Sequence, residues 1–143
     1  MHDYAPFIFT GWAIGFWVIW LVVVILYLIT LFNVLNAVSP ANRKLEPGLV
    51  FLLLIPLFNL VWNFIVVIKL RDSLQAEYAA RDLQGDGFAY GVGLAMCILT
   101  LCGIIPILGA LAAIAAFVCW IIFWVKMAGY RKTLANSAAQ PSA

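Results

Sequence analysis

Residues 7–38 read FIFTGWAIGFWVIWLVVVILYLITLFNVLNAV, and no charged side chain occurs among them. A helix needs about 20 apolar residues, each rising about 1.5 Å, to cross the hydrocarbon core of a bilayer. This run exceeds that length, so we expect a transmembrane helix that is tilted or extends into the headgroups. The run is also longer than the apolar part of a signal peptide and follows no basic segment. We therefore expect it to stay in the mature protein.

The composition of the whole chain agrees with a membrane protein. Of its 143 residues, 66% are hydrophobic and 10% are charged, whereas a soluble domain is nearer half apolar and a quarter charged. A chain of this size cannot cover so many apolar side chains with its own polar surface, so lipid must cover the excess. The formal net charge of +2 and the absence of a basic stripe in the sequence argue against nucleic-acid binding.

Three further apolar runs follow the first and are separated by charged or Gly- and Pro-containing segments. The predicted spans are residues 7–38, 49–70, 88–104 and 106–130. The second helix is expected to continue as an amphipathic extension to residue 83, because Leu70, Leu74 and Tyr78 recur every four residues between polar side chains. On its polar faces, Glu77 and Arg81 have the favourable i,i+4 order, and we expect the acidic side chains here to be solvated.

The predicted fold is therefore an all-α membrane protein with four transmembrane helices arranged as two hairpins. The second helix extends into the cytoplasm, residues 1–143 form one domain, and residues 136–143 form a flexible polar tail. Four crossings put both termini and the middle loop on one side, which then holds six Lys and Arg residues, against Arg43 and Lys44 on the other. The excess of basic residues predicts that both termini lie in the cytoplasm.

One stretch of the chain resembles a known group of proteins. It contains NR at 42–43, PG at 47–48, IPLFNLVW at 55–62 and SL at 73–74. This pattern resembles a group of small bacterial four-span membrane proteins without an assigned function, over roughly a quarter of the chain. The resemblance implies a multi-pass protein of the bacterial inner (cytoplasmic) membrane. It supplies no catalytic residue.

Polar residues inside the predicted spans are the first candidates for a functional site. Asn59 and Asn63 are four residues apart and therefore share one helix face, which should point toward other helices because an amide facing lipid is costly. They could bond between helices and fix the helix register. Alternatively, they could line a pore or pocket together with Thr100 and Asn33.

Small and aromatic residues are the second set of candidates. Small residues four apart let two helix backbones approach closely in a membrane, and the deep tryptophans can contact another helix through the indole N–H. The predicted packing or oligomer faces comprise Gly11, Gly15, Gly109, Ala113, Ala116, Trp20 and Trp120.

The sequence offers no catalytic, cofactor-binding or metal-binding residue. The central part of each predicted span lacks charged residues and histidine, and the single histidine of the chain is His2. Proton relays and ion-coupled carriers usually need a charged group in the membrane, so we predict a protein that is not an enzyme and holds no cofactor. The three cysteines form no C-x-x-C pair and are expected to be packing residues.

Two hypotheses for the function remain. In the first, the protein is a structural or accessory subunit in the lipid bilayer that assembles with itself or with other membrane subunits, using Leu74 and Tyr78 on a cytoplasmic arm for docking. In the second, it is a homo-oligomeric channel or small carrier for a neutral or weakly charged solute, lined by transmembrane Asn and Thr residues. The two hypotheses differ in whether the amides face a dry helix contact or a cavity.

Overall fold

The computed structural model describes residues 5–105 and 108–139, and within these residues all regular secondary structure is helical, with five helices and no strand. This confirms the predicted all-α class. In chain order the elements are α1 (Ala5–Ala37), η1 (Pro47–Leu54, a 3-10 helix), α2 (Pro56–Ala80), α3 (Tyr90–Cys102) and α4 (Gly109–Ala139). The predicted start of the fourth span at residue 106 and residues 140–143 of the predicted tail lie outside the described residues. Residues 136–139, which were also assigned to the tail, continue α4.

Two of these helices are long and apolar enough to span a membrane, namely α1 over Thr10–Ala37 and α4 over Gly109–Ala139. Only 28% and 22% of the residues in their most apolar stretches are buried, so most of this apolar surface faces outward, unlike the core helix of a soluble protein. The other two predicted spans do not meet the same criterion. α3 has 13 residues, which gives a length of about 20 Å.

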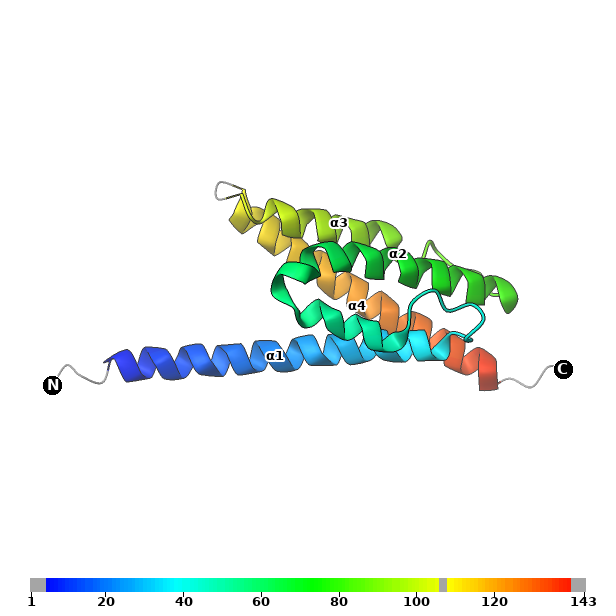
Figure 1. Ribbon diagram of the computed structural model, residues 1–143, viewed down its shortest axis with the longest axis horizontal. Helices are drawn as coiled ribbons and strands as arrows, with labels where there is room; N and C mark the ends of the chain where they lie inside the picture. The colour runs from blue at the N-terminus through cyan, green and yellow to red at the C-terminus, as the bar shows by residue number, and fades with distance from the viewer. Residues whose placement is uncertain (1–4, 106–107, 140–143) are drawn as a thin grey trace.

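The predicted second span is not one continuous helix. The chain forms η1, adopts an extended conformation at Ile55 (φ −83°, ψ 111°), and begins α2 at Pro56. A proline disfavours the helical conformation in the residue before it, which explains the break. The Trp62 indole N–H donates to the Leu49 carbonyl oxygen over 2.9 Å. η1 and α2 therefore lie side by side and run in opposite directions (Figure 1).

The C-terminal ends of α1, α2 and α4 meet at one end of the molecule. The Arg81 guanidinium, just after α2, donates to the Leu134 carbonyl of α4 over 2.9 Å and to the Ala37 carbonyl of α1 over 3.3 Å. The N-terminal end of α1 and the C-terminal end of α4 consequently lie at opposite ends of the protein (Figure 1). The prediction that the loop after the first helix lies across the membrane from the C-terminal end of the last helix is therefore wrong, because η1 and α2 together return the chain to the end from which they started.

This common end, which we call the charged end, contains residues 38–46, the C-terminal half of α2, residues 81–89 and the C-terminal part of α4. All eight Lys and Arg residues of the chain belong to it: Arg43, Lys44, Lys69, Arg71, Arg81, Lys126, Arg131 and Lys132. Ser73 connects the segments, since its hydroxyl accepts the Lys44 backbone N–H over 2.8 Å and donates to the Lys69 carbonyl over 2.7 Å.

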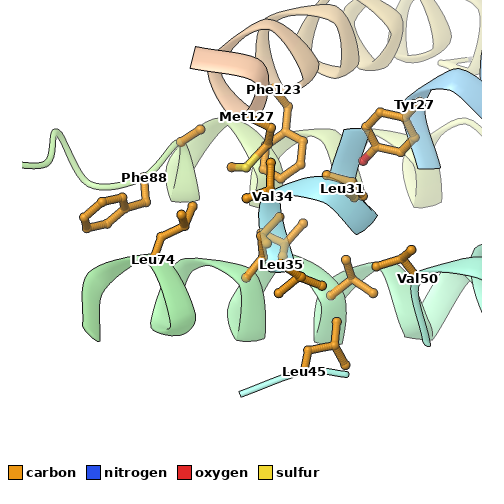
Figure 2. Packing of buried hydrophobic residues seen from close by; sticks show 14 of the residues in the cluster. Tyr27, Leu31, Val34, Leu35, Leu45, Val50, Leu74, Phe88, Phe123 and Met127 are labelled. Carbon is orange, nitrogen blue, oxygen red and sulfur yellow. The ribbon is translucent and has the colours of Figure 1, made fainter. Parts of the chain in front are cut away.

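The hydrophobic core lies next to the charged end. Tyr27, Leu31 and Val34 of α1 pack near Phe123 and Met127 of α4 (Figure 2), and Leu35, Val50, Leu70 and Leu74 extend the same cluster. By contrast, every side chain from residue 10 to residue 22 is exposed, and this half of α1 extends beyond the other helices (Figure 1). The other elements therefore pack around the C-terminal half of α1, and the N-terminal end of α1 projects past them.

Candidate functional site

A cavity of about 570 Å³ lies between α1, α2, α3 and α4, on the side of the core away from the charged end. Three of the four residues predicted as a polar lining border it, namely Asn59 and Asn63 of α2 and Thr100 of α3. The fourth, Asn33 of α1, is partly buried elsewhere and does not line the cavity. The bundle thus brings together polar residues that are about forty positions apart in the sequence.

The two asparagines owe their position to the start of α2. Pro56 begins the helix, Asn59 follows within the first turn, and Asn63 lies one turn later on the same face. Both side chains are partly buried, yet within residues 5–105 and 108–139 neither side-chain amide makes a hydrogen bond. A side-chain amide offers two N–H donors and one acceptor oxygen. Both asparagines can therefore donate to and accept from a molecule in the cavity.

Thr100 differs from the asparagines because its hydroxyl is already used as a donor. Its Oγ1 donates to the Met96 carbonyl over 2.8 Å, one turn earlier in α3. A hydroxyl oxygen that donates one hydrogen bond can still accept another. Thr100 can therefore act only as an acceptor toward the cavity in this rotamer, while each asparagine can donate and accept.

Aromatic rings form another part of the cavity wall. The ring centroids of Trp20 and Trp120 are 6.1 Å apart, and those of Phe117 and Trp120 are 5.9 Å apart. All three rings line the cavity. Trp20 and Trp120 were predicted to contact other helices, and here they contact each other across α1 and α4. The wall is thus an aromatic surface next to two amides.

The small residues of α4 also border this region. Ala113 and Ala116 line the cavity, and Gly109 is the first residue of α4, where an added Cβ would be 2.8 Å from the Gly103 carbonyl oxygen. The small residues of α1 behave differently, because a Cβ at Gly11 or Gly15 would meet no atom within 4 Å. Of the predicted small-residue faces, the one on α4 is therefore used inside the bundle and the one on α1 points outward.

A second polar cluster, the Glu77 cluster, lies at the charged end and comprises Ser39, Asn42, Glu77 and Arg81. Glu77 is only 1% exposed. Its carboxylate accepts hydrogen bonds from the Ser39 backbone N–H (3.1 Å), the Ser39 hydroxyl (2.7 Å), the Asn42 amide (2.8 Å) and the Arg81 Nε–H (2.8 Å). The prediction of a solvated acidic side chain is wrong for Glu77, because the loop after α1 folds over it.

The hydrogen bonds of this cluster determine the ionisation of Glu77. Burial raises the pKa of its carboxyl, but the hydrogen bonds from Asn42, Ser39 and Arg81 outweigh burial and lower the pKa from 4.5 to about 2. Glu77 is therefore ionised at neutral pH. Because four donors surround the carboxylate, we interpret the Glu77 cluster as a structural link between α1, α2 and α4 and not as a reactive site.

The predicted docking residues Leu74 and Tyr78 are part of the core. Leu74 is fully buried and Tyr78 is 3% exposed. The Tyr78 ring lies edge-on to Phe88 at 4.9 Å and to Tyr130 at 6.0 Å between ring centroids. The prediction of a projecting arm is therefore wrong: the apolar face of this extension packs against the segment before α3 and the C-terminal part of α4.

Neither the cavity nor the Glu77 cluster contains a set of side chains suited to a metal ion. Across the described part of the chain, no group of three or more His, Cys, Asp or Glu residues could hold a metal ion. The cavity is lined by Asn, Thr, aromatic and aliphatic side chains, and no charged residue occurs among its described lining residues. Its chemistry is that of neutral hydrogen bonding and apolar packing.

Comparison of the chain with protein-family models, with curated proteins and with solved structures finds no match.

Proposed function

We propose that this protein is a non-enzymatic integral membrane protein that binds a neutral, largely apolar molecule in the cavity between α1, α2, α3 and α4, either to carry it or to hold it within a larger assembly. The observation that carries the proposal is the pair of unpaired amides, Asn59 and Asn63, which line the cavity. Binding pockets are typically apolar with a few polar groups that orient the ligand. The described residues that line the cavity carry no charge. This favours an uncharged ligand, because burying an unpaired charge is costly.

We further propose that the protein lies in a bacterial inner membrane with its charged end in the cytoplasm. The resemblance of residues 42–78 to small bacterial membrane proteins supports the location. The grouping of all eight Lys and Arg residues at one end supports the orientation, since basic residues next to membrane-spanning helices favour the cytoplasmic side. The N-terminal end of α1 is then on the opposite side of the membrane.

Native mass spectrometry of the protein, extracted gently from its membrane, tests the binding function. We expect a bound molecule of defined mass on the natural protein. The double variant Asn59→Leu, Asn63→Leu should lose it, because leucine is similar in size but offers no hydrogen bond. Asn33→Leu is the matched control, since it changes an α1 amide that lies away from the cavity. Equal retention of the bound molecule by the double variant and the control would contradict the proposal.

The same spectra test self-assembly, which is the second candidate function. It is favoured by the exposed, aromatic-rich residues 10–22 of α1, where the Gly11 and Gly15 face has no neighbour within 4 Å. Close backbone approach at such a face promotes helix association in membranes. We expect a homo-oligomer that Gly11→Leu and Gly15→Leu dissociate, while Gly129→Leu, at another open position, leaves it intact. A monomer in the natural protein would exclude self-assembly.

A further inference from the structure

A second hollow, which we call the α1 groove, lies beside the cavity. It has a volume of about 680 Å³ and runs between α1 and the turn that joins η1 to α2. Ile14, Val18 and Leu21 of α1 form one side, and Leu54 and Pro56 belong to the other. Except for Asn59, the groove is lined by apolar and aromatic side chains.

The groove and the cavity adjoin each other. Trp20, Val24, Leu53 and Asn59 line both. The groove wall is aliphatic and aromatic, Asn59 is shared by both hollows, and the cavity adds Asn63 and Thr100. The two hollows together therefore have an apolar outer part and an inner part in which polar side chains occur among apolar ones.

In the membrane location proposed above, the outer part of the groove would face the bilayer. The side chains of Ile14 and Val18 are 59% and 55% exposed, and they belong to the stretch of α1, residues 10–22, in which every side chain is exposed. A molecule in the groove would thus remain in contact with lipid along its length. It could reach the cavity from the bilayer without passing through water.

Resting on the binding function proposed above, we propose that the ligand is a neutral single-chain amphiphile, with its uncharged polar head at Asn59 and Asn63 and its hydrocarbon chain in the α1 groove. The amides can both donate to and accept from a hydroxyl, ester or carbonyl group. A phosphate or carboxylate head would need a basic partner, and none is found among the described residues that line the two hollows.

Three probes of matched chain length separate the contributions of head and chain. They are monooleoylglycerol with a neutral head, oleate with a charged head, and octadecene with no head, each added to the full-length protein in nanodiscs of one phospholipid. Retained probe is counted by native mass spectrometry. We expect monooleoylglycerol to be retained about tenfold more than oleate or octadecene, as for a difference of about 1.4 kcal/mol. The double variant Asn59→Leu, Asn63→Leu should remove this preference for the neutral head.

Two tryptophan substitutions test the chain position. Val18 lines the groove and Val22 does not, although their exposures are similar at 55% and 50%. Val18→Trp should lower monooleoylglycerol retention about tenfold, while Val22→Trp leaves it unchanged. Leu21→Trp is a second groove variant, and because these side chains are exposed on α1, all three variants are expected to fold.

The outcomes distinguish failure of this inference from failure of the binding function. If both valine variants retain the probe equally while the double asparagine variant loses it, the cavity binds a molecule without using the groove, and the inference is overturned alone. Oleate retention equal to that of monooleoylglycerol would also overturn it. If no probe is retained and the double variant loses no native ligand, both proposals are overturned.

Discussion

At the scale of single residues, Glu77 connects parts of the chain that are distant in the sequence. Its partners Ser39 and Asn42 lie 38 and 35 positions away, and its partner Arg81 also bonds to Leu134 and Ser137 of α4. Removing one member of a buried ion pair leaves the other without compensation, which typically costs about 3–5 kcal/mol. The cluster should therefore determine whether the helices stay together at the charged end.

This predicts an acid-dependent loss of stability. The Glu77 pKa is lower in the folded protein, at about 2, than the ordinary value of 4.5, so the carboxylate stabilises the fold above pH 4.5. That contribution, about 3 kcal/mol at about 1.4 kcal/mol per pKa unit, should be lost as the pH falls from 4.5 toward 2. Thermal melting in mild detergent across this range measures it.

The variant Glu77→Gln assigns the effect to this residue. At neutral pH it should melt at a lower temperature than the natural protein, because the amide leaves the Arg81 charge unpaired, and its melting should change less between pH 4.5 and pH 2. Glu46→Gln is the control, since Glu46 is exposed. Natural and Glu77→Gln proteins with the same acid dependence would rule out Glu77 as the cause.

Residue spacing predicted part of the site and missed the rest. The four-residue interval between Asn59 and Asn63 was enough to put both amides on one helix face. Whether that face meets another helix or a cavity depends on the side chains that α1 and α4 place opposite, which spacing on α2 does not encode. Glu77 was misassigned for the same reason, because its burial comes from Ser39 and Asn42 in a loop and not from its own helix.

At the scale of elements, Gly93 sets how closely α3 can approach its neighbours. A Cβ at Gly93 would lie 2.6 Å from Val67 Cγ1 of α2 and 2.9 Å from Phe123 Cε2 of α4. Both neighbours are in the core and nearly fully buried, so they have little room to move. Gly93 is thus a point at which α3 packs closely against both α2 and α4.

We predict that Gly93→Ala lowers the free energy of unfolding by about 1–3 kcal/mol, as overpacking usually does. Gly91→Ala is the matched control on the same helix, because its Cβ would meet no atom within 4 Å, and alanine should stabilise the helix by up to about 1 kcal/mol. Denaturant titration in mixed micelles measures both. A Gly93→Ala protein as stable as Gly91→Ala would show that the helices can separate at no cost.

The elements also show where apolar run length fails as a predictor. The predicted span from 49 to 70 was long enough for one crossing, but Pro56 divides it into η1 and α2, which pack against each other through Trp62 and Leu49. The length of an apolar run indicates only that the segment avoids water. It does not indicate whether the segment crosses the bilayer or returns to the side from which it came.

At the scale of the whole molecule, this return changes the expected arrangement in the membrane. With four full crossings, residues 38–46 would be separated from residues 81–89 and from the end of α4 by the bilayer. In the structure, Arg81 bonds to both Ala37 and Leu134, so these segments share one end. In this arrangement all eight Lys and Arg residues lie on one side of the membrane and none on the other. This is a stronger bias than the six against two that four crossings would give.

Labelling of single cysteines with a membrane-impermeant maleimide tests this arrangement in sealed vesicles. In a variant with Cys97, Cys102 and Cys119 changed to Ala, cysteines are introduced one at a time at the exposed positions Ala41, Gln84 and Asn136. We expect all three to be labelled from the cytoplasmic side only, because the Glu77 cluster holds their segments together. Four full crossings instead require Ala41 to be labelled from the opposite side to Gln84 and Asn136. Since Ala41 lies in the loop that also provides Ser39 and Asn42, labelling from that opposite side would contradict both the orientation and the Glu77 cluster.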